Sequence, residues 1–244
     1  MHLKNIPLYL LLCSLTMLSA PPLNAEITLD QSVIDVIAGS TRRADFHVYN
    51  RGNSTQSVQI EVYKVLFPGQ PEEQRVTLSN PREMGMIATP RQFDVEPQGR
   101  RKVRLSFLGI PEDTDAIYRV VVKPRQIATP KDDQKAPIVS IVFNYEVLAV
   151  YRPPSPVSAL EFSHTNNGLT FTNTGNSNFL LYVGRECRSK QAPDCKVLPT
   201  KRIYAGASHT YMIDDDTRHV SFLVKDHQEP RAITLCGNPL TYCD

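Results

Sequence analysis

The chain has 244 residues, of which 41% are hydrophobic and 21% are charged, and its formal net charge is +2. This composition is that of an ordinary globular chain, and it excludes a disordered chain and a collagen-like fibre. The near-neutral charge argues against a dedicated nucleic-acid binder. Nineteen Pro and no Trp favour many short elements over a helical bundle, because Pro interrupts helices.

The first 25 residues have the features of a cleaved signal peptide. Lys4 precedes a mostly apolar run from Leu8 to Leu18, and Ala25 is the small residue that a signal peptidase requires. The run is too short to span a bilayer, and no other stretch approaches the roughly 20 apolar residues of a membrane helix. We therefore expect a mature chain that begins near Glu26 and is exported without insertion into a membrane.

Cysteine usage fits an oxidising compartment. One of the five cysteines lies in the signal peptide, and the other four lie in the C-terminal quarter of the chain. Their spacing favours two local disulfides, although the two crossed connectivities stay open. Zinc is the competing interpretation, but it would prefer C-x-x-C spacing in a reducing cell. The expected local pairs are Cys187 with Cys195 and Cys236 with Cys243.

The rest of the chain reads as a series of short strands. Apolar residues alternate with polar ones at a period of two, as in Phe46 and Val48 and again in Leu169 and Phe171. This alternation is typical of half-buried strands. Turn clusters separate the strands closely enough to predict an all-β, antiparallel sandwich architecture.

Two features predict two domains. The segments 50–54 and 173–177 have similar sequences, and each lies between two alternating strands, which indicates that one strand-turn-strand corner is used twice. The Pro-rich segment 153–156 cannot continue a central strand. We therefore expect a first sandwich domain at 26–152, a linker at 153–156 and a second sandwich domain at 157–244. One large sandwich with a proline-rich corner is the alternative.

A long apolar strand is expected from Val139 to Tyr151. Val139, Ile141, Phe143 and Tyr145 share one of its faces, since side chains alternate along a strand. Such a strand is usually part of a core, and the periodicity favours that use. Its other use is as an uncovered edge, which offers unpaired amides and carbonyls to the strand of a partner.

Several motifs in this chain occur in the order and spacing of one protein family. With them, the chain resembles the PapD-like periplasmic chaperones of chaperone-usher pilus assembly, and it is most similar to their alternate branch of common-pilus and colonisation-factor chaperones. The resemblance implies two immunoglobulin-like domains in a boomerang arrangement. The motifs are Ala88-Thr89-Pro90, Phe93, Pro97, Arg104, Ile110-Pro111-Glu112-Asp113, Tyr118-Arg119-Val120, Tyr151-Arg152-Pro153, and Gly168-Leu169 with Asn173.

The resemblance also implies a function in the periplasm. The chain would bind one pilin subunit in a one-to-one complex, and an edge strand of its first domain would complete the core of a subunit that lacks its final strand. An outer-membrane usher would then exchange the chaperone strand. The implied donor positions are Val139, Ile141 and Phe143, with Tyr145 as an addition. Self-association is expected of the free chaperone, because its apolar edge needs cover.

Arg152 of the Tyr-Arg-Pro motif is expected to hold the angle between the domains. The resemblance implies that it pairs with Asp115 and Asp226, one acidic residue from each domain. A forked guanidinium can bridge two carboxylates. The alternative is that all three are ordinary surface charges, since exposed ion pairs are common and individually weak.

The sequence departs from the family where the family anchors the carboxylate of its client. Well-known members use an Arg in the first strand and a Lys three positions before the Tyr-Arg-Pro motif, and the matching positions here are Val33, with Ile34 next to it, and Leu148. Arg119 and Lys123 are the replacement candidates. They are four residues apart on a strand expected over 117–123, so both point to one face, and their neighbours Tyr118, Val120 and Val122 should face the core. A structural role for either Arg119 or Lys123 is the alternative.

Enzymatic motifs are not found in the sequence. It has no G-x-S-x-G elbow, no H-E-x-x-H pair and no glycine-rich phosphate loop, and neither its histidines nor Asp214 to Asp216 follow a metal-binding pattern. We therefore expect no enzyme, no catalytic residue, no cofactor and no metal. A secreted pilus subunit or adhesin is the alternative function. The chaperone is favoured over it because residues 26–36 read directly as a first strand, with no donor extension before it.

Overall fold

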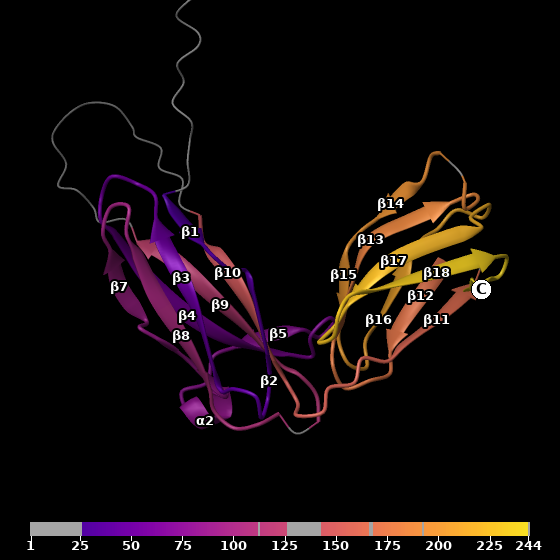
Figure 1. Cartoon of the computed structure of the whole chain (residues 1–244). Coiled ribbons are helices and arrows are strands. Elements are labelled where there is room, and N and C mark those ends of the chain that lie inside the picture. The colour runs from indigo at the N-terminus through magenta and orange to yellow at the C-terminus, as the bar shows by residue number, and fades with distance from the viewer. Residues whose placement is uncertain (1–25, 112, 126–142, 166–167, 192, 244) are drawn as a thin grey trace, which may run out of the picture.

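The structure, a computed structural model, describes residues 26–111, 113–125, 143–165, 168–191 and 193–243. Two β-sandwiches form two arms that meet at an angle (Figure 1). The prediction of an all-β fold with two sandwiches is therefore confirmed. None of the described helices is long and apolar enough to cross a membrane. The signal peptide expected at residues 1–25 lies outside the described residues.

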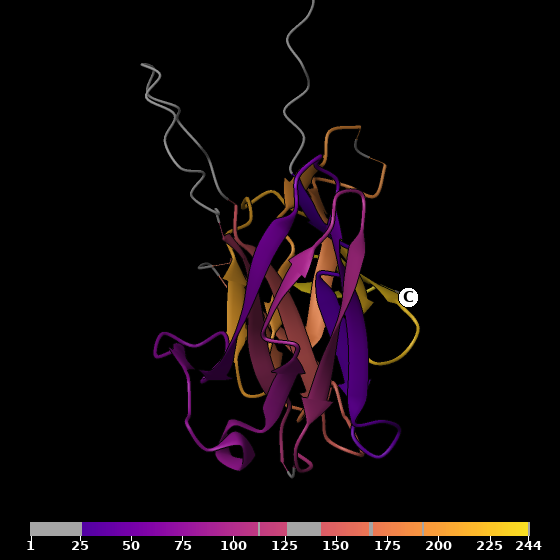
Figure 2. The same ribbon diagram turned by 90° about the vertical axis from the view of Figure 1, so that its left-hand side faces the viewer.

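The first sandwich consists of two sheets, and Figure 2 turns it toward the viewer. Its strands are β1 (Ile27–Leu29), β2 (Val33–Ile37), β3 (Arg43–Asn50), β4 (Gln56–Leu66), β5 (Gln74–Val76), β6 (Met86–Thr89), β7 (Gln92–Val95), β8 (Arg100–Phe107), β9 (Ala116–Arg125) and β10 (Tyr145–Arg152). One sheet has the order β1-β3-β8-β6, and the other has the order β2-β10-β9-β4-β5, with β7 also paired to β4. The pair of β2 and β10 is parallel.

The unbroken first strand expected over residues 26–36 is wrong. β1 ends at Leu29 and pairs with β3, whereas β2 begins at Val33 and pairs with β10 in the other sheet. In the break, the carboxylate of Asp30 accepts a hydrogen bond of 2.8 Å from the backbone N–H of His47. The chain thus crosses from one sheet to the other, and apolar residues of both short strands reach the same core.

A single short helix, α2 (Pro81–Met84), is described between β5 and β6. The side chain of Asn80 caps its first turn by accepting a 3.0 Å hydrogen bond from the backbone N–H of Arg82, as N-cap residues do. Gly85 ends the helix with a φ of 80°, which glycine adopts without steric cost. The helix places Met84, which is buried, in the first core.

The second sandwich also consists of two sheets. Its strands are β11 (Leu160–Thr165), β12 (Gly168–Asn173), β13 (Phe179–Cys187), β14 (Lys196–Leu198), β15 (Lys201–Ile203), β16 (Ser208–Tyr211), β17 (His219–Lys225), β18 (Arg231–Gly237) and β19 (Leu240–Tyr242). The smaller sheet has the order β11-β12-β16. The larger sheet has the order β14-β13-β17-β18-β19, with β15 also paired to β13.

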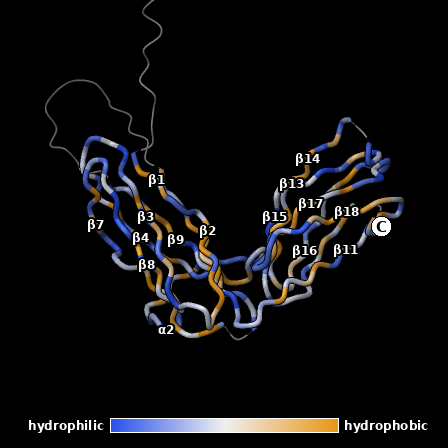
Figure 3. The backbone as a smooth tube through the Cα atoms, viewed as in Figure 1, coloured by the Kyte–Doolittle hydropathy of each residue, from blue (hydrophilic) through white to orange (hydrophobic). Residues whose placement is uncertain are grey.

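Each sandwich encloses an apolar core, and the core of the second sandwich extends to the outer face of the first. Hydrophobic residues alternate with hydrophilic ones along the strands of both arms (Figure 3), as the period of two predicts. The second core includes the rings of Phe171 and Phe222, whose centroids are 5.4 Å apart. It also takes in four side chains of the first sandwich, namely Val65, Ile117, Leu148 and Val150. Apolar packing therefore contributes to the joint between the arms.

The repeated corner predicted from the sequence is present in both sandwiches. The side-chain amide of Asn50 donates to the carbonyl of Ser54 at 2.7 Å, and its oxygen accepts from the N–H of Gly52 at 2.9 Å. Asn173 makes the same two contacts in the second sandwich, to Ser177 at 2.9 Å and from the glycine two residues on at 3.0 Å. Both asparagines are fully buried. The corner is thus fixed by one hydrogen-bonding device used twice.

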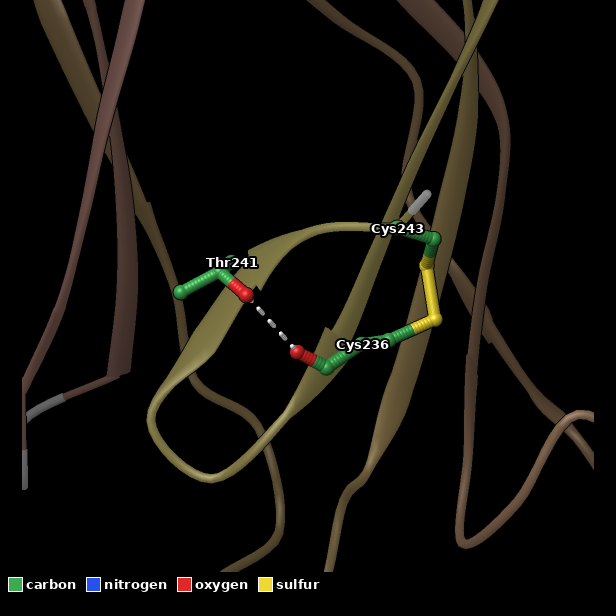
Figure 4. The surroundings of a disulfide bond; sticks show 3 residues. All are labelled: Cys236, Thr241 and Cys243. Carbon is green, nitrogen blue, oxygen red and sulfur yellow. Dashed lines mark hydrogen bonds between the residues drawn. A yellow bond between two sulfur atoms is a disulfide. The ribbon is translucent and has the colours of Figure 1, made fainter.

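The structure contains two local disulfides in the second sandwich. Cys187 is bonded to Cys195, and Cys236 is bonded to Cys243. The second bond joins the last strands of the larger sheet, where the hydroxyl of Thr241 also donates to the carbonyl of Cys236 at 3.5 Å (Figure 4). These are the near pairs that the spacing favoured, and the crossed connectivities are not those of the structure.

Candidate functional site

An open strand edge lies at the beginning of β10. On one side, Tyr145 to Tyr151 pair with β9. On the other side, β2 covers β10 only from Leu148 onward. Among the described strands, none pairs with that side of residues 145–147, and an unpaired strand edge of this kind is one to which a further strand can add.

The expected donor positions fall partly within the described residues. Val139 and Ile141 lie outside them. Phe143 precedes β10 and is 59% exposed, which is unusual for so large an apolar side chain. The expected strand therefore begins at Tyr145 in the described part of the chain, because the pairing with β9 begins there.

Tyr145 is less exposed than Phe143, the other expected donor position that the structure describes. Its side chain is half-buried and packs against the core of the first sandwich, on the same face of β10 as Val147 and Ala149. Burial accordingly raises the pKa of the Tyr145 hydroxyl. Of the two, Phe143 is the side chain that the structure presents to solvent.

The outer face of β9 carries both expected anchor residues. Arg119 and Lys123 point away from the core, whereas their neighbours Tyr118, Val120 and Val122 are buried, as predicted. This face is turned toward the second sandwich, because Ile117 on the same face belongs to the second core.

Arg119 and Lys123 differ in how fully they are paired. Lys123 Nζ lies 2.6 Å from a carboxylate oxygen of Glu61, and this hydrogen bond, with one from Tyr63, lowers the pKa of Glu61. Arg119 Nη1 lies 3.1 Å from Glu146, but Arg75 holds the same carboxylate at 2.6 Å. The Nε atom of Arg119 is buried and has no hydrogen-bond partner among the described residues. The hydrogen-bonding capacity of the Arg119 guanidinium is thus not fully used among the described residues.

A third basic residue, Arg202 of β15, joins this region from the second sandwich. Its guanidinium donates to the side-chain oxygen of Asn178 and forms no ion pair with a carboxylate among the described residues. Burial lowers the pKa of Arg202, and the charges of Arg152 and Arg119 act in the same direction. Arg202 therefore adds a positive charge to the region between the two arms without a carboxylate of its own among the described residues.

Apolar residues stand at the positions where the resemblance places a basic pair. Val33 of β2 and Leu148 of β10 are direct neighbours in the parallel pair. Leu148 is buried in the second core, whereas Val33 is 44% exposed. The two positions are thus adjacent in space, but neither can bind a carboxylate by charge.

Arg152 lies at the joint between the arms and is only 1% exposed. Its Nε and Nη2 atoms donate to the two carboxylate oxygens of Asp35 at 2.6 and 2.7 Å. Its Nη1 atom donates to the carbonyl of Asn178 at 3.0 Å and to the hydroxyl of Ser177. Burial opposes the charged guanidinium, but the hydrogen bonds and charge of Asp35 outweigh it and raise the pKa of Arg152. The side chain therefore ties the last strand of the first sandwich to the second sandwich.

Asp115 completes the joint from the first sandwich. Its carboxylate is 3.9 Å from Arg152 Nη1. It accepts hydrogen bonds from the hydroxyl of Ser177 at 2.7 Å and from the backbone N–H of Asn178 at 2.6 Å. Asp115 thus contacts Arg152 weakly and binds the second sandwich directly.

The expected ion pair between Arg152 and Asp226 is not formed. Asp226 lies 2.6 Å from Arg231 on the neighbouring strand and also accepts from the backbone N–H of Gln228 at 2.7 Å. These local donors satisfy the carboxylate, so its charge reaches Arg152 only at longer range. The second carboxylate on Arg152 is Asp35, which the sequence did not single out.

Sequence reasoning missed Asp35, Asn178 and Arg202. Asp35 is separated from Arg152 by 117 positions, and only the parallel pairing of β2 with β10 brings it there. Asn178 directly follows the repeated corner, which the sequence did reveal, so its proximity to that motif was a usable signal. No pattern in the sequence singles out Arg202. In the part of the chain that the structure describes, no cluster of three or more His, Cys, Asp or Glu could hold a metal ion.

No family model matches the chain. Two curated relatives, both from Escherichia coli, are similar in sequence. One is a CS1 fimbrial subunit, which is 29% identical over 181 residues, or 71% of this chain and 76% of the relative. The other is a CFA/I fimbrial subunit, which is 24% identical over 187 residues, or 74% of this chain and 78% of the relative.

Solved structures give a more extensive likeness. The class 5 fimbriae chaperone CfaA is 20% identical, with a TM-score of 0.61 over 85% of this chain and 97% of that one. The SafB chaperone of Salmonella enterica, in complex with the SafA pilin, has a TM-score of 0.61 over 86% and 96% at 16% identity. This chain has the fold of the periplasmic fimbrial chaperones. The fold that the resemblance implied is therefore confirmed over both arms.

Proposed function

We propose that this chain is a periplasmic chaperone that binds and stabilises fimbrial subunits by donating a strand edge. The observation that carries the proposal is the open side of residues 145–147 in β10, with the exposed Phe143 directly before it. An incoming strand would gain main-chain hydrogen bonds along this edge, and apolar side chains beside it would fill the groove of an incomplete subunit. Burial of a phenylalanine there would contribute about 1.5 to 3 kcal/mol.

A fimbrial subunit is the second candidate, because the curated relatives carry that description. A subunit that lacks its final strand would expose part of its own core. Here β10 closes the first sandwich, and Val103, Leu105 and Val147 in its core have no exposed surface. The closed core favours a chaperone, which supplies a strand to another protein, over a fimbrial subunit, which needs a strand from another protein.

The proposed role requires no catalysis and no cofactor. Strand pairing and apolar burial drive the folding of the client, and the chaperone then delivers the client to an outer-membrane usher, where the chaperone strand is exchanged. The two disulfides suit the periplasm, which is an oxidising compartment. The expected division into domains at 26–152 and 157–244 accompanies this proposal, since the client would be held by the first domain.

The C-terminal carboxylate of the client is the proposed ligand of the basic residues between the arms. Arg119 is the stronger of the two anchors expected from the sequence, because its Nε atom lacks a partner among the described residues, whereas Lys123 is neutralised by Glu61 at 2.6 Å. Arg202 adds a second guanidinium from the other arm. Arg119 shares its one carboxylate, Glu146, with Arg75, and Arg202 has none among the described residues, so two forked cations there suit a further carboxylate ligand.

Co-expression in a bacterial periplasm tests the proposed function. The mature chain is produced with the fimbrial subunits encoded beside it, recovered by affinity purification and examined by mass spectrometry for bound protein. We expect one client molecule per chain, and its loss in Phe143→Asp and Ile141→Asp, because a charge cannot be solvated in the apolar groove of a client.

Phe67→Asp is the matched control, since Phe67 is also in the first sandwich and is 54% exposed. It should leave recovery unchanged. Loss of the fold in Phe143→Asp would mean that this residue belongs to the core and that the edge is misassigned. Assembly of the chain itself into fibres would instead establish the fimbrial-subunit alternative.

A further inference from the structure

The outer face of the smaller sheet in the first sandwich points away from the second sandwich (Figure 1). The other sheet, β2-β10-β9-β4-β5, supplies Val65, Ile117 and Leu148 of its outer face to the second core. The two sheets enclose the first core between them, so the outer face of β1-β3-β8-β6 is directed to the opposite side. We call it the back face. Its four strands contain none of the residues of the joint or of the open β10 edge.

Basic side chains cover the back face. On β3 and β8, its residues alternate with buried ones such as Phe46 and Val103, because successive side chains of a strand point to opposite sides. Asp45 is the only acidic residue in either strand, and both strands are described throughout. The basic and histidine residues of these two strands that lie on the back face are Arg43, His47, Arg100, Lys102 and Arg104.

Carboxylates neutralise only part of this charge. Arg104 donates to the two oxygens of Asp45 at 2.8 and 2.9 Å, and Lys102 Nζ lies 3.5 Å from the same carboxylate. Asp30, which follows β1, lies 2.8 Å from the Nδ1 atom of His47. Both acidic groups of the face are therefore already engaged by cations or by a histidine of the face itself.

Three arginines of the back face have no carboxylate partner among the described residues. Arg43 and Arg100 are exposed and form no ion pair there. Arg51 joins them, because its guanidinium carbon lies 4.8 Å from the centre of the Tyr49 ring, and Tyr49 is paired with Arg100 on the same side of the sheet. Positive charges held close together repel one another. A partner with negative charge would relieve this repulsion.

The positive charge continues past the ends of β3 and β8. Arg42 directly precedes β3, and Arg82 lies on α2. Neither forms an ion pair within the described residues. They line one hollow of about 400 Å³ together with Phe107, Leu108 and Gly109. Two guanidiniums beside one open hollow suit a phosphate group, which they can bind through forked hydrogen bonds.

We infer that the back face is a docking surface for an anionic phospholipid membrane. The net charge of the chain is only +2, so attraction to such a membrane depends on the concentration of cations on one face. Each Lys or Arg near an anionic lipid surface adds to that attraction. An acidic protein is a poorer match, because the centres of protein interfaces are depleted in charged residues and Ile87 is the only large apolar residue exposed on the four strands.

The contact is peripheral and leaves the client site free. With so little exposed apolar surface, the back face rests on lipid headgroups and does not enter the hydrocarbon. The open edge of β10 belongs to the other sheet, so a client held there does not cover the back face. The inference thus goes beyond the proposed function and does not require a client. For a periplasmic chaperone, the contact would concentrate the loaded chain at a membrane surface.

Co-sedimentation of the full mature chain with lipid vesicles tests the inference. The chain should bind vesicles of equal parts phosphatidylglycerol and phosphatidylcholine at low salt, less so at high salt, and it should not bind vesicles of phosphatidylcholine alone. The double variant Arg43→Gln/Arg100→Gln should bind the anionic vesicles about tenfold more weakly. Its matched control is Lys190→Gln/Lys201→Gln, which removes the same charge from exposed positions on the second sandwich and should bind as wild type does.

Three results would overturn the inference. The first is a wild-type chain that does not bind the anionic vesicles. The second is an equal loss in the two double variants, because net charge and not the back face would then determine binding. The third is retention of an acidic protein by the back face in place of vesicles. Recovery of the client by Arg43→Gln/Arg100→Gln should equal that of wild type, so failure of the membrane contact and failure of the proposed function are observed separately. Circular dichroism confirms that each variant is folded before it is compared.

Discussion

Removal of Arg152 should weaken the joint between the two sandwiches severely. The guanidinium is 1% exposed, and its hydrogen bonds to Asp35 and Asn178 span both arms. Breaking a buried ion pair by removing one partner costs about 3–5 kcal/mol, because the remaining charge is left unpaired. Asp35 is 36% exposed and can regain water, so we expect Arg152→Ala to lower the free energy of unfolding by about 3 kcal/mol.

Urea unfolding followed by circular dichroism measures this loss, and Arg104→Ala is its control. Arg104 holds Asp45 in the same forked geometry, at 2.8 and 2.9 Å, but its side chain is 42% exposed. The control should lose far less stability, because water screens an exposed pair. Arg152→Lys should fall between wild type and Arg152→Ala, since it keeps the charge but loses the fork. Equal losses in Arg152→Ala and Arg104→Ala would refute the argument that burial gives this contact its strength.

Two further predictions concern packing and pH. Gly184→Ala should destabilise the second sandwich by about 1–3 kcal/mol, since the new methyl group would clash with a core aromatic ring, and an unchanged midpoint in thermal unfolding would contradict this. Hydrogen bonds from Arg104 lower the pKa of Asp45 from 3.8 to about 2, so the stability that it contributes is present above pH 3.8 and is lost as the pH falls toward 2. Urea midpoints measured from pH 5 to pH 2 should therefore fall less steeply in Asp45→Asn than in wild type.

The strands and the repeated corner could be predicted because their signals are local. Alternation at a period of two places Tyr118, Val120 and Val122 in the core and Arg119 outside it, whatever the strand pairs with. The corner at Asn50 is readable for the same reason, since its hydrogen bonds close within a few residues. The break in the first strand was not readable, because residues 26–36 alternate on both sides of it and only the pairing partners distinguish the two halves.

The residues of the candidate site were predicted only in part. Arg119 lies on β9 and Phe143 precedes β10, and the alternation of both segments is visible in the sequence. The exposure of Phe143 and the unpartnered Nε atom of Arg119 are seen only in the structure. The division of the chain near residue 153 and the roles of Val139 and Ile141 stay predictions. Arg202 was not predicted, because a lone arginine on a short strand has no distinguishing pattern.

The sequence by itself determined which residues face each core, that the chain is all β, and that one corner occurs twice. It could do so because side-chain alternation and turn chemistry act over a few residues. The tertiary structure alone decided that Arg152 binds Asp35 and not Asp226, and that β10 has an open edge in the described part of the chain. Those outcomes depend on which strands become neighbours, and residues 117 positions apart meet only once β2 and β10 have paired within the first sandwich.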